Sequence, residues 1–341
     1  MKPLVSILIP GYNAENWAAA AIESALRQTW PRKEIIFVDD GSTDRTLSVA
    51  DKFSSRGVFV TSQPNRGASA ARNKAFSFCQ GDYIQWLDAD DELAPDKIAR
   101  QMEVADRLAD PRALLSSEWG RFIYRLNRSK FTPTLLWNDL PPVEWLLRKM
   151  SNNIWMQTGT WLVSRELTEA AGRWDEQLSF DDDGEYFCRV LSKSSGVKFV
   201  HGSKAYYRAS GPGSLSDVDA SNRKLESAWR SIQLHIRYLL QLEDSGRTRE
   251  ACIKFLQTWL PIFDPHRPDI ICHAQQTAEH LGARVELKDT METLRWKFAW
   301  MKNVFGDKVA FRAQAKLPQF KHSMIRFWDK TMFQFQRIAR P

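Results

Sequence analysis

The sequence predicts an α/β protein with a mostly parallel central sheet and helices on both of its faces. Two observations predict this class. Short apolar runs alternate with helical stretches over the first two-thirds of the chain, and two acidic clusters directly follow two of these runs. Strand–helix alternation favours parallel strands, because each return to the same edge of a sheet needs a crossover connection. Ligands of such sheets bind beyond the carboxyl ends of the strands.

The apolar runs of the first hundred residues are expected to be buried strands, and the stretches between them helices. The predicted strands are Leu4–Ile9, Glu34–Val38, Val58–Thr61 and Tyr83–Leu87. The predicted helices are Glu15–Gln28, Thr43–Phe53, Ala68–Phe78 and Pro95–Leu108. Ser42 is expected to cap the second helix, with Asp44 in its first turn.

The alternation loosens after about residue 111. Strands are expected at Ala113–Ser117, Phe122–Tyr124, Thr160–Val163, Val197–Val200 and Lys204–Tyr207, and helices at Val143–Met150 and Asp183–Leu191. Gly211-Pro212-Gly213 then interrupts the chain. Apolar residues recur at helical spacing between Leu225 and Leu240, and further helices are expected at Glu250–Trp259 and Ile270–Leu281. We therefore predict two domains, residues 1–215 and a helical extension over 216–341.

The composition excludes several classes of protein. Of 341 residues, 43% are apolar and 26% charged, which is typical of a globular chain and not of a disordered or collagen-like one. No stretch approaches the roughly 20 apolar residues that a membrane span needs. The four cysteines have no close spacing, which argues against a zinc or disulfide framework and favours a reducing compartment. We expect a cytoplasmic protein without a targeting segment.

Positive charge is concentrated at the end of the chain. The net charge is +7, and residues 291–341 alone contain eleven basic and three acidic side chains together with ten aromatic ones. One interpretation is a packed helical subdomain with a basic, solvated face. The other is a surface that binds anionic lipid, which would make the protein peripheral on the inner face of the membrane. Nucleic acid is not expected, because no nucleic-acid motif accompanies the charge.

The two acidic clusters follow predicted strands of one sheet. Asp39-Asp40 comes directly after EIIFV, and Asp88-Ala89-Asp90-Asp91 directly after YIQWL. Carboxylates gathered at one edge repel each other unless a positive group lies between them. A divalent cation such as Mg²⁺ or Mn²⁺ would supply that charge, since it takes oxygen ligands from carboxylates and substrate phosphates. A polar turn with a helix cap is the alternative for either cluster alone.

Several motifs together resemble glycosyltransferase family 2, a group of GT-A enzymes that use nucleotide-diphospho-sugars. They are PGYN, VDDGSTD, NRGASAARN and GDYIQWLDADDEL in the first half, and TGT, GRWDE and the pair Asp182-Asp183 followed by Arg189 in the second. The resemblance covers about residues 3–210. It implies a GT-A fold and an inverting, metal-dependent transferase that takes a sugar, most simply from a UDP-sugar, to an acceptor hydroxyl in bacterial cell-surface polysaccharide synthesis.

The resemblance also implies roles in binding the donor. Pro10, Tyr12 and Asn13 would line the nucleotide pocket, with Tyr12 beside the base. Asp40 would accept a hydrogen bond from the base, and Asp39 would contribute to the same pocket. Arg72 would lie near the base or the phosphates.

Further roles follow for the chemistry. Asp88 and Asp90 would form the D-x-D signature, with Asp90 the direct ligand of Mn²⁺ or Mg²⁺ and Asp88 nearer the ribose. Asp183 would be the catalytic base, preceded by Asp182 where relatives carry Glu. A histidine that follows Tyr-Arg in many relatives is missing here, so Arg208 or His201 is expected to meet the diphosphate. Trp161 and Trp174 are candidates for stacking against an acceptor sugar.

Two other functions remain open from the sequence. The sugar acceptor could be a polyprenyl phosphate instead of a glycan or lipid-linked glycan. The protein could also bind nucleotide-sugars without catalysis, although Asp88, Asp90 and Asp183 argue against this.

Overall fold

The computed structural model describes residues 2–209, 221–264, 266–287 and 323–335. They form two compact units, which are described separately. The first contains Met1–Arg121 and Lys130–Val285, and the second contains Phe122–Ser129 and Glu286–Pro341. The expected domain boundary near residue 215 lies outside the described residues, so the division at that point stays a prediction.

The first unit is built on a five-stranded sheet in the order β3-β2-β1-β4-β8. The strands are β1 (Val5–Gly11), β2 (Lys33–Asp39), β3 (Val58–Ser62), β4 (Tyr83–Trp86) and β8 (Val163–Ser164). The first four are parallel, and β8 pairs antiparallel with β4 at the edge. Every residue of β1 is buried, as expected for a strand covered on both faces. The predicted α/β class with a mostly parallel sheet is therefore confirmed.

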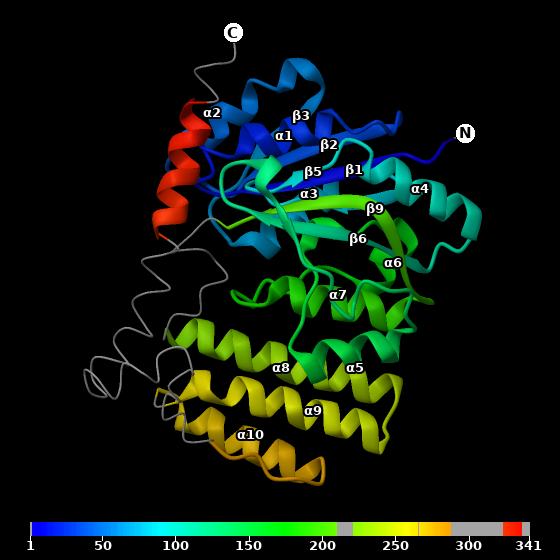
Figure 1. The fold of residues 1–341 in the computed structure, drawn as a ribbon, viewed down its shortest axis with the longest axis vertical. Helices are drawn as coiled ribbons and strands as arrows, with labels where there is room; N and C mark the ends of the chain where they lie inside the picture. Colours follow the sequence, from blue (N-terminus) through cyan, green and yellow to red (C-terminus); the bar gives the residue numbers. More distant parts are fainter. Residues whose placement is uncertain (1, 210–220, 265, 288–322, 336–341) are drawn as a thin grey trace. The chain divides into compact units, whose positions relative to one another are not determined.

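Helices cover both faces of this sheet (Figure 1). They are α1 (Ala18–Leu26), α2 (Thr46–Asp51), α3 (Ala68–Phe78), α4 (Lys97–Leu108) and α6 (Arg165–Ala171). Side chains of β1 alternate between two separate cores, with Ile7 and Ile9 in one and Leu8 in the other. The predicted cap at Ser42 is wrong, because α2 begins only after Arg45 and the Ser42 hydroxyl accepts a hydrogen bond from Asn13 instead.

A second, four-stranded sheet has the order β5-β9-β6-β7. Its strands are β5 (Glu92–Leu93), β9 (Gly196–Arg208), β6 (Ala113–Phe122) and β7 (Lys130–Phe131). The sequence suggested two strands, Val197–Val200 and Lys204–Tyr207, in place of β9, and Gly202 lies between them. The structure keeps one strand through this point, where the Gly202 amide donates to the Glu118 carboxylate at 2.9 Å.

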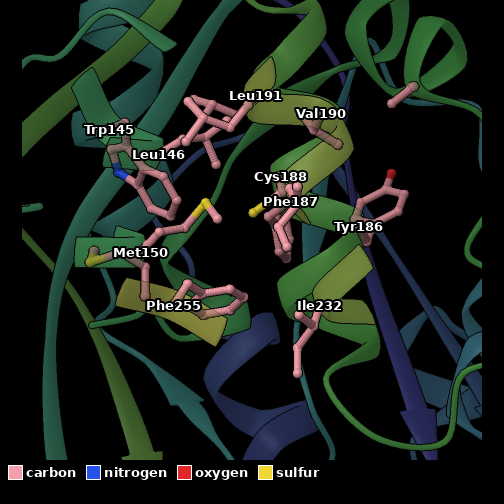
Figure 2. Packing of buried hydrophobic residues seen from close by; sticks show 14 of the residues in the cluster. Trp145, Leu146, Met150, Tyr186, Phe187, Cys188, Val190, Leu191, Ile232 and Phe255 are labelled. Carbon is pink, nitrogen blue, oxygen red and sulfur yellow. The ribbon is translucent and has the colours of Figure 1, made fainter. Parts of the chain in front are cut away.

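Five more helices complete the first unit and stack in layers (Figure 1). They are α5 (Pro142–Asn152), α7 (Asp182–Lys193), α8 (Asn222–Leu242), α9 (Gly246–Trp259) and α10 (Pro268–His280). Met150, Cys188, Ile232 and Phe255 bring four of them into one core (Figure 2). The same core contains Leu8 of the central sheet, so the helices that follow residue 221 pack with the strands as one hydrophobic body. Short 3-10 turns occupy Ser54–Arg56, Thr158–Thr160 and Leu260–Phe263 of this unit, and Leu126–Arg128 of the second unit.

In the second unit, a helix over residues 323–335 is joined to the segment Phe122–Ser129. Asp329 is buried and forms an ion pair with Arg125 at 2.6 Å, and it also accepts from the amide of Tyr124 at 2.9 Å. Phe327 and Trp328 lie on the exposed part of this helix. Among the described residues, no helix is both long and apolar enough to cross a membrane.

Candidate functional site

Three loops meet at one edge of the central sheet. They follow the carboxyl ends of β1, β2 and β4, which are parallel neighbours, and they contain Tyr12-Asn13, Asp39-Asp40 and Asp88–Asp91. The edge is therefore where an open α/β sheet binds its ligand. Pro10 is buried within β1 and pairs with Val38 of β2 near this edge.

The two carboxylates after β2 have different surroundings. Asp40 accepts hydrogen bonds from Gln63 Nε2 at 2.7 Å and from the amides of Arg66 and Gly67 at 3.0 and 2.8 Å, so both of its oxygens hold the loop after β3. Asp39 accepts from the Ser42 amide through Oδ2, but its buried Oδ1 has no partner among the described residues. A buried oxygen without a partner is costly. Asp39 is therefore better suited than Asp40 to accept from a nucleotide base.

The β1 loop presents an aromatic ring to solvent. Tyr12 is 48% exposed, so its ring is accessible to a ligand. Asn13 takes a left-handed backbone conformation, with φ of 47°, and its Oδ1 accepts from the Thr43 amide at 2.9 Å. The Asn13 side chain therefore joins the β1 and β2 loops and fixes the position of the loop that carries Tyr12.

Arg72 connects the segment after β4 with the start of α7. It is buried, and its guanidinium donates to Asp88 Oδ1 at 2.8 Å and to Asp182 Oδ2 at 2.7 Å. The guanidinium also lies over the ring of Trp174, 4.3 Å from its centroid. Burial would lower the pKa of Arg72, but the two carboxylates outweigh it and the pKa is raised. The sequence placed Arg72 near the base or phosphates, whereas its described contacts connect the end of β4 with the start of α7.

The acidic cluster after β4 is partly used by the fold. Asp91 is buried, and it accepts from Gln157 Nε2 at 2.5 Å and from the Arg208 amide at 2.7 Å. Burial raises its pKa well above the usual range, and the nearby carboxylates of Asp90 and Asp88 add to the effect. Asp88 and Asp90 themselves are only partly buried. They are the members of the cluster that can meet a ligand.

Arg208 does not lie open to the site as the missing histidine suggested. Its guanidinium donates to Glu92 Oε1 at 3.0 Å and to the Asp90 carbonyl at 2.7 Å, and it covers the Trp17 ring at 4.2 Å. Burial lowers the pKa of Arg208. These contacts make it a support for the backbone of the D-x-D segment. His201, the alternative, is exposed on β9 against Phe199.

Asp183 lies in the first turn of α7, next to Asp182. Its Oδ2 accepts from Thr158 Oγ1 at 3.2 Å, and its Oδ1 from the Gly184 amide at 2.8 Å. Desolvation raises the pKa of Asp183 to about 7, and the carboxylates of Asp182 and Asp181 contribute in the same direction. A carboxylate with such a pKa is a stronger base than an ordinary aspartate, whose pKa is near ~3.9.

Helix α8 forms hydrogen bonds with the loop that precedes α7, a role that the sequence did not reveal. Ser227 Oγ accepts from the amides of Ser179 and Phe180, both at 2.9 Å. One turn later, Ser231 Oγ donates to Asp181 Oδ2 at 2.6 Å. Asp181 has a left-handed backbone, with φ of 55°, and its carboxylate covers Gly184 so closely that a Cβ there would clash. The only sequence signal was two serines four residues apart on an otherwise apolar helix face.

Trp161 and Trp174 cannot bind an acceptor sugar in this structure. Both are buried, and Trp174 stacks on Tyr186 with ring centroids 3.9 Å apart, while Trp161 stacks on Phe187 at 5.2 Å. Their candidate role was wrong because composition cannot separate core tryptophans from exposed ones. The core needs these rings to support α7 and Arg72.

Asp88 and Asp90 are the residues that could hold a metal ion at this edge of the sheet. Among the described residues, no three His, Cys, Asp or Glu side chains are grouped as ligands. Mg²⁺ is commonly bound by one or two carboxylates together with substrate phosphates, so fewer protein ligands are sufficient. Asp88 and Asp90, partly exposed at the end of β4, fit that requirement.

Comparison with known proteins shows which protein family residues 6–141 resemble. Residues 6–141 match the sequence profile of Glycosyl transferase family 2. TuaG of Bacillus subtilis (strain 168), named for teichuronic acid biosynthesis, is 42% identical over 105 residues, which cover 30% of this chain and 42% of TuaG. Chondroitin synthase of Pasteurella multocida (strain Pm70) is 46% identical over 98 residues, which cover 28% of this chain and 10% of the synthase. These matches thus span less than half of the relatives' length.

Longer matches exist at lower identity. EpsJ of Bacillus subtilis (strain 168), an uncharacterized glycosyltransferase, is 29% identical over 73% of this chain and 74% of its own. The structure of S. aureus TarS in complex with UDP-GlcNAc aligns with a TM-score of 0.65 at 16% identity, over 83% of this chain and 84% of the other. Residues 6–141 therefore match glycosyltransferase family 2, and the described fold is the GT-A fold of neighbours such as TarS.

The raised pKa of Asp183 gives a first prediction. Asp183→Asn keeps the size of the side chain and removes its basicity, so we expect kcat to fall about 10²–10⁴-fold while nucleotide affinity is unchanged. In the wild type, kcat should rise as the pH increases through about 7, because the carboxylate must lose its proton before it can accept one. Steady-state kinetics across this pH range would test both expectations.

Thermal unfolding of the same variant is the control. Because folding raises this pKa, the stability that Asp183 contributes is present in acid and is lost as the pH rises through about 7. Asn cannot ionise, so the variant should gain melting temperature relative to wild type above that pH. A variant with wild-type kcat and an unchanged pH profile would remove Asp183 from the mechanism.

Proposed function

We propose that this protein transfers a sugar from a nucleotide-diphospho-sugar, most simply a UDP-sugar, to an acceptor hydroxyl with inversion at the anomeric carbon. The observation that carries the proposal is the connected set Asp88–Arg72–Asp182, which brings the D-x-D strand end beside the raised-pKa carboxylate of Asp183. The complex of TarS with UDP-GlcNAc supports a UDP-sugar donor. The names of TuaG and chondroitin synthase support a role in bacterial polysaccharide synthesis.

Asp183 acts as the general base in this proposal. It takes the proton of the acceptor hydroxyl and orients that oxygen toward the anomeric carbon, from the side opposite the leaving nucleoside diphosphate. Thr158, which donates to the same carboxylate, holds its orientation. A single displacement from the opposite side inverts the anomeric centre, so a product of inverted configuration is expected.

The donor is held by the three loops at the sheet edge. Tyr12 stacks on the base, and the unpartnered Oδ1 of Asp39 accepts from it. Asp90, with Asp88, would hold Mn²⁺ or Mg²⁺ against the diphosphate. Such an ion, when bound, neutralises the charge that grows on the leaving group.

Two alternative functions are transfer to a polyprenyl phosphate and binding of nucleotide-sugars without catalysis. If the acceptor is a polyprenyl phosphate, the attacking oxygen is already ionised and the reaction needs no general base. The raised pKa of Asp183 therefore favours a hydroxyl acceptor. A protein that only binds nucleotide-sugars would have no use for a desolvated carboxylate at this position.

The second unit supports a location at the membrane surface. In the helix over residues 323–335, Phe327 is 72% and Trp328 64% exposed, and this helix lies within the basic stretch 291–341. Exposed aromatics beside basic residues favour the interface of an anionic bilayer. We therefore propose a cytoplasmic protein that is peripheral on the inner face of the membrane, where a lipid-linked glycan acceptor would lie.

The donor and metal are tested together. Donor hydrolysis should be screened across UDP-, GDP- and dTDP-sugars, with and without EDTA. We expect one UDP-sugar to be cleaved, cleavage to stop with EDTA, and Mn²⁺ or Mg²⁺ to restore it, because the diphosphate leaving group needs a counter-charge. Full cleavage in excess EDTA would contradict the metal, and no cleavage of any donor would contradict the transferase.

Vesicle binding tests the membrane proposal. The full-length protein should co-sediment with phosphatidylglycerol-rich vesicles at low salt and be released as salt rises, since exposed charges are screened. Replacing Phe327 and Trp328 by alanine should weaken binding about tenfold or more, because two apolar side chains no longer enter the interface. The matched control replaces Phe59 and Phe78, another exposed aromatic pair, and should bind like wild type. Equal binding by all three proteins, or none by any, would contradict this role.

A further inference from the structure

Three aromatic side chains outside the donor loops form what we call the aromatic platform: Trp119, Trp155 and Tyr207. Trp155 is 42% exposed, while the other two are partly buried. The Trp155 ring lies 4.7 Å from Trp119 and 5.7 Å from Tyr207, measured between ring centroids. Nothing in the donor site or the general-base mechanism uses these residues.

The exposed Trp155 ring is packed against the two other rings of the platform. Trp119 is tilted by 32° against Trp155, and Tyr207 meets both indoles edge-on, at interplanar angles of 88° and 80°. Edge-to-face contacts of this kind are favourable between aromatic rings. The Arg121 guanidinium lies 5.5 Å from the Tyr207 ring centroid. An exposed indole fixed by its neighbours loses little conformational entropy when a ligand covers it.

The chain places the platform close to the proposed base. Trp155 is three residues before Thr158, whose hydroxyl donates to Asp183 Oδ2, and three residues span at most about 10 Å. Gln157, two residues after Trp155, donates to Asp91. Tyr207 is adjacent to Arg208, whose amide donates to the same Asp91. Trp155 and Tyr207 therefore each lie within two residues of a hydrogen bond to Asp91.

We propose that the aromatic platform binds a sugar ring of the acceptor, with Trp155 as its principal contact; this rests on the proposed transferase function. The face of an aromatic ring is electron-rich, and the C–H face of a pyranose is weakly positive and apolar. A sugar stacked on Trp155 would lie within one or two sugar units of Asp183. The acceptor class is therefore a glycan with a pyranose at or next to the attacked hydroxyl, and not a bare lipid phosphate or polyol phosphate.

The buried tryptophans strengthen this assignment. Trp161 and Trp174 are enclosed by the core, so neither offers a face to a ligand. The other exposed aromatic pair, Phe59 and Phe78, lies on β3 and α3 with ring centroids 5.0 Å apart. Phe59 is the second residue of β3, paired with Ile36, and Phe78 is the last residue of α3, so neither belongs to the loops after the carboxyl ends of the strands. The pair therefore serves as a matched control for aromatic exposure away from the site.

The test uses the full chain and the nucleotide-sugar found by donor hydrolysis. Donor cleavage is measured with increasing concentrations of p-nitrophenyl glycosides of hexoses and hexosamines, alongside undecaprenyl phosphate and a polyol phosphate as probes of the other classes. Stimulation that saturates with a glycoside gives its KM. We expect Trp155→Ala to raise this KM about tenfold or more, as truncation of a central tryptophan contact does. Trp155→Phe should retain part of the affinity, and Phe59→Ala should match wild type.

Donor hydrolysis in water and nucleotide affinity should be equal in all of these proteins, because the ring contacts described for Trp155 are with Trp119 and Tyr207 and not with the donor loops. Unchanged glycoside KM in Trp155→Ala would overturn the proposal, as would stimulation of the wild type only by a lipid or polyol phosphate. A parallel loss of donor hydrolysis in Trp155→Ala would also overturn it, since the residue would then support the fold or the donor. No donor cleavage or nucleotide binding by wild type would instead contradict the proposed function itself.

Discussion

The site depends on one buried guanidinium. Arg72 lies on α3 and forms ion pairs with Asp88, which follows β4, and with Asp182, which begins α7. Asp182 is 110 residues away from Arg72 in the sequence. Without Arg72, several carboxylates would face each other in a partly desolvated space, and they would be protonated or pushed apart. Trp174 covers the guanidinium, and the core around Tyr186 and Phe187 holds Trp174 in place. The position of the proposed base therefore follows from one charge and the rings that enclose it.

The helices beyond the central sheet also help to position Asp183. Ser227 and Ser231 of α8 fix the loop that leads into α7, and Met150, Ile232 and Phe255 pack α5, α8 and α9 into the core beneath it. A helical region that looked like an appendage in the sequence thus supports the carboxylate that the chemistry needs. The donor loops, by contrast, rely on contacts among themselves, such as those of Asn13 and Asp40.

Much of the fold could be predicted because it is encoded locally. Strands such as β1 and β2 are short apolar runs, and the acidic residues at their ends mark the ligand edge. Roles that depend on distant partners could not be predicted. Arg72 and Arg208 were expected to face the nucleotide or its diphosphate, and the structure instead gives each a carboxylate partner far along the chain. Burial of Trp174 and exposure of Trp155 likewise depend on tertiary packing, which a single sequence does not contain.

The most direct test of this arrangement is the coupling free energy between Arg72 and Asp182. Free energies of unfolding are determined in urea for wild type, Arg72→Met, Asp182→Asn and the double variant. If the guanidinium holds the carboxylate as described, each single variant already breaks the Arg72–Asp182 ion pair, and the double variant should be about 1–3 kcal/mol more stable than the sum of the single effects predicts. Additive effects, within about 0.5 kcal/mol, would contradict the central place of this ion pair.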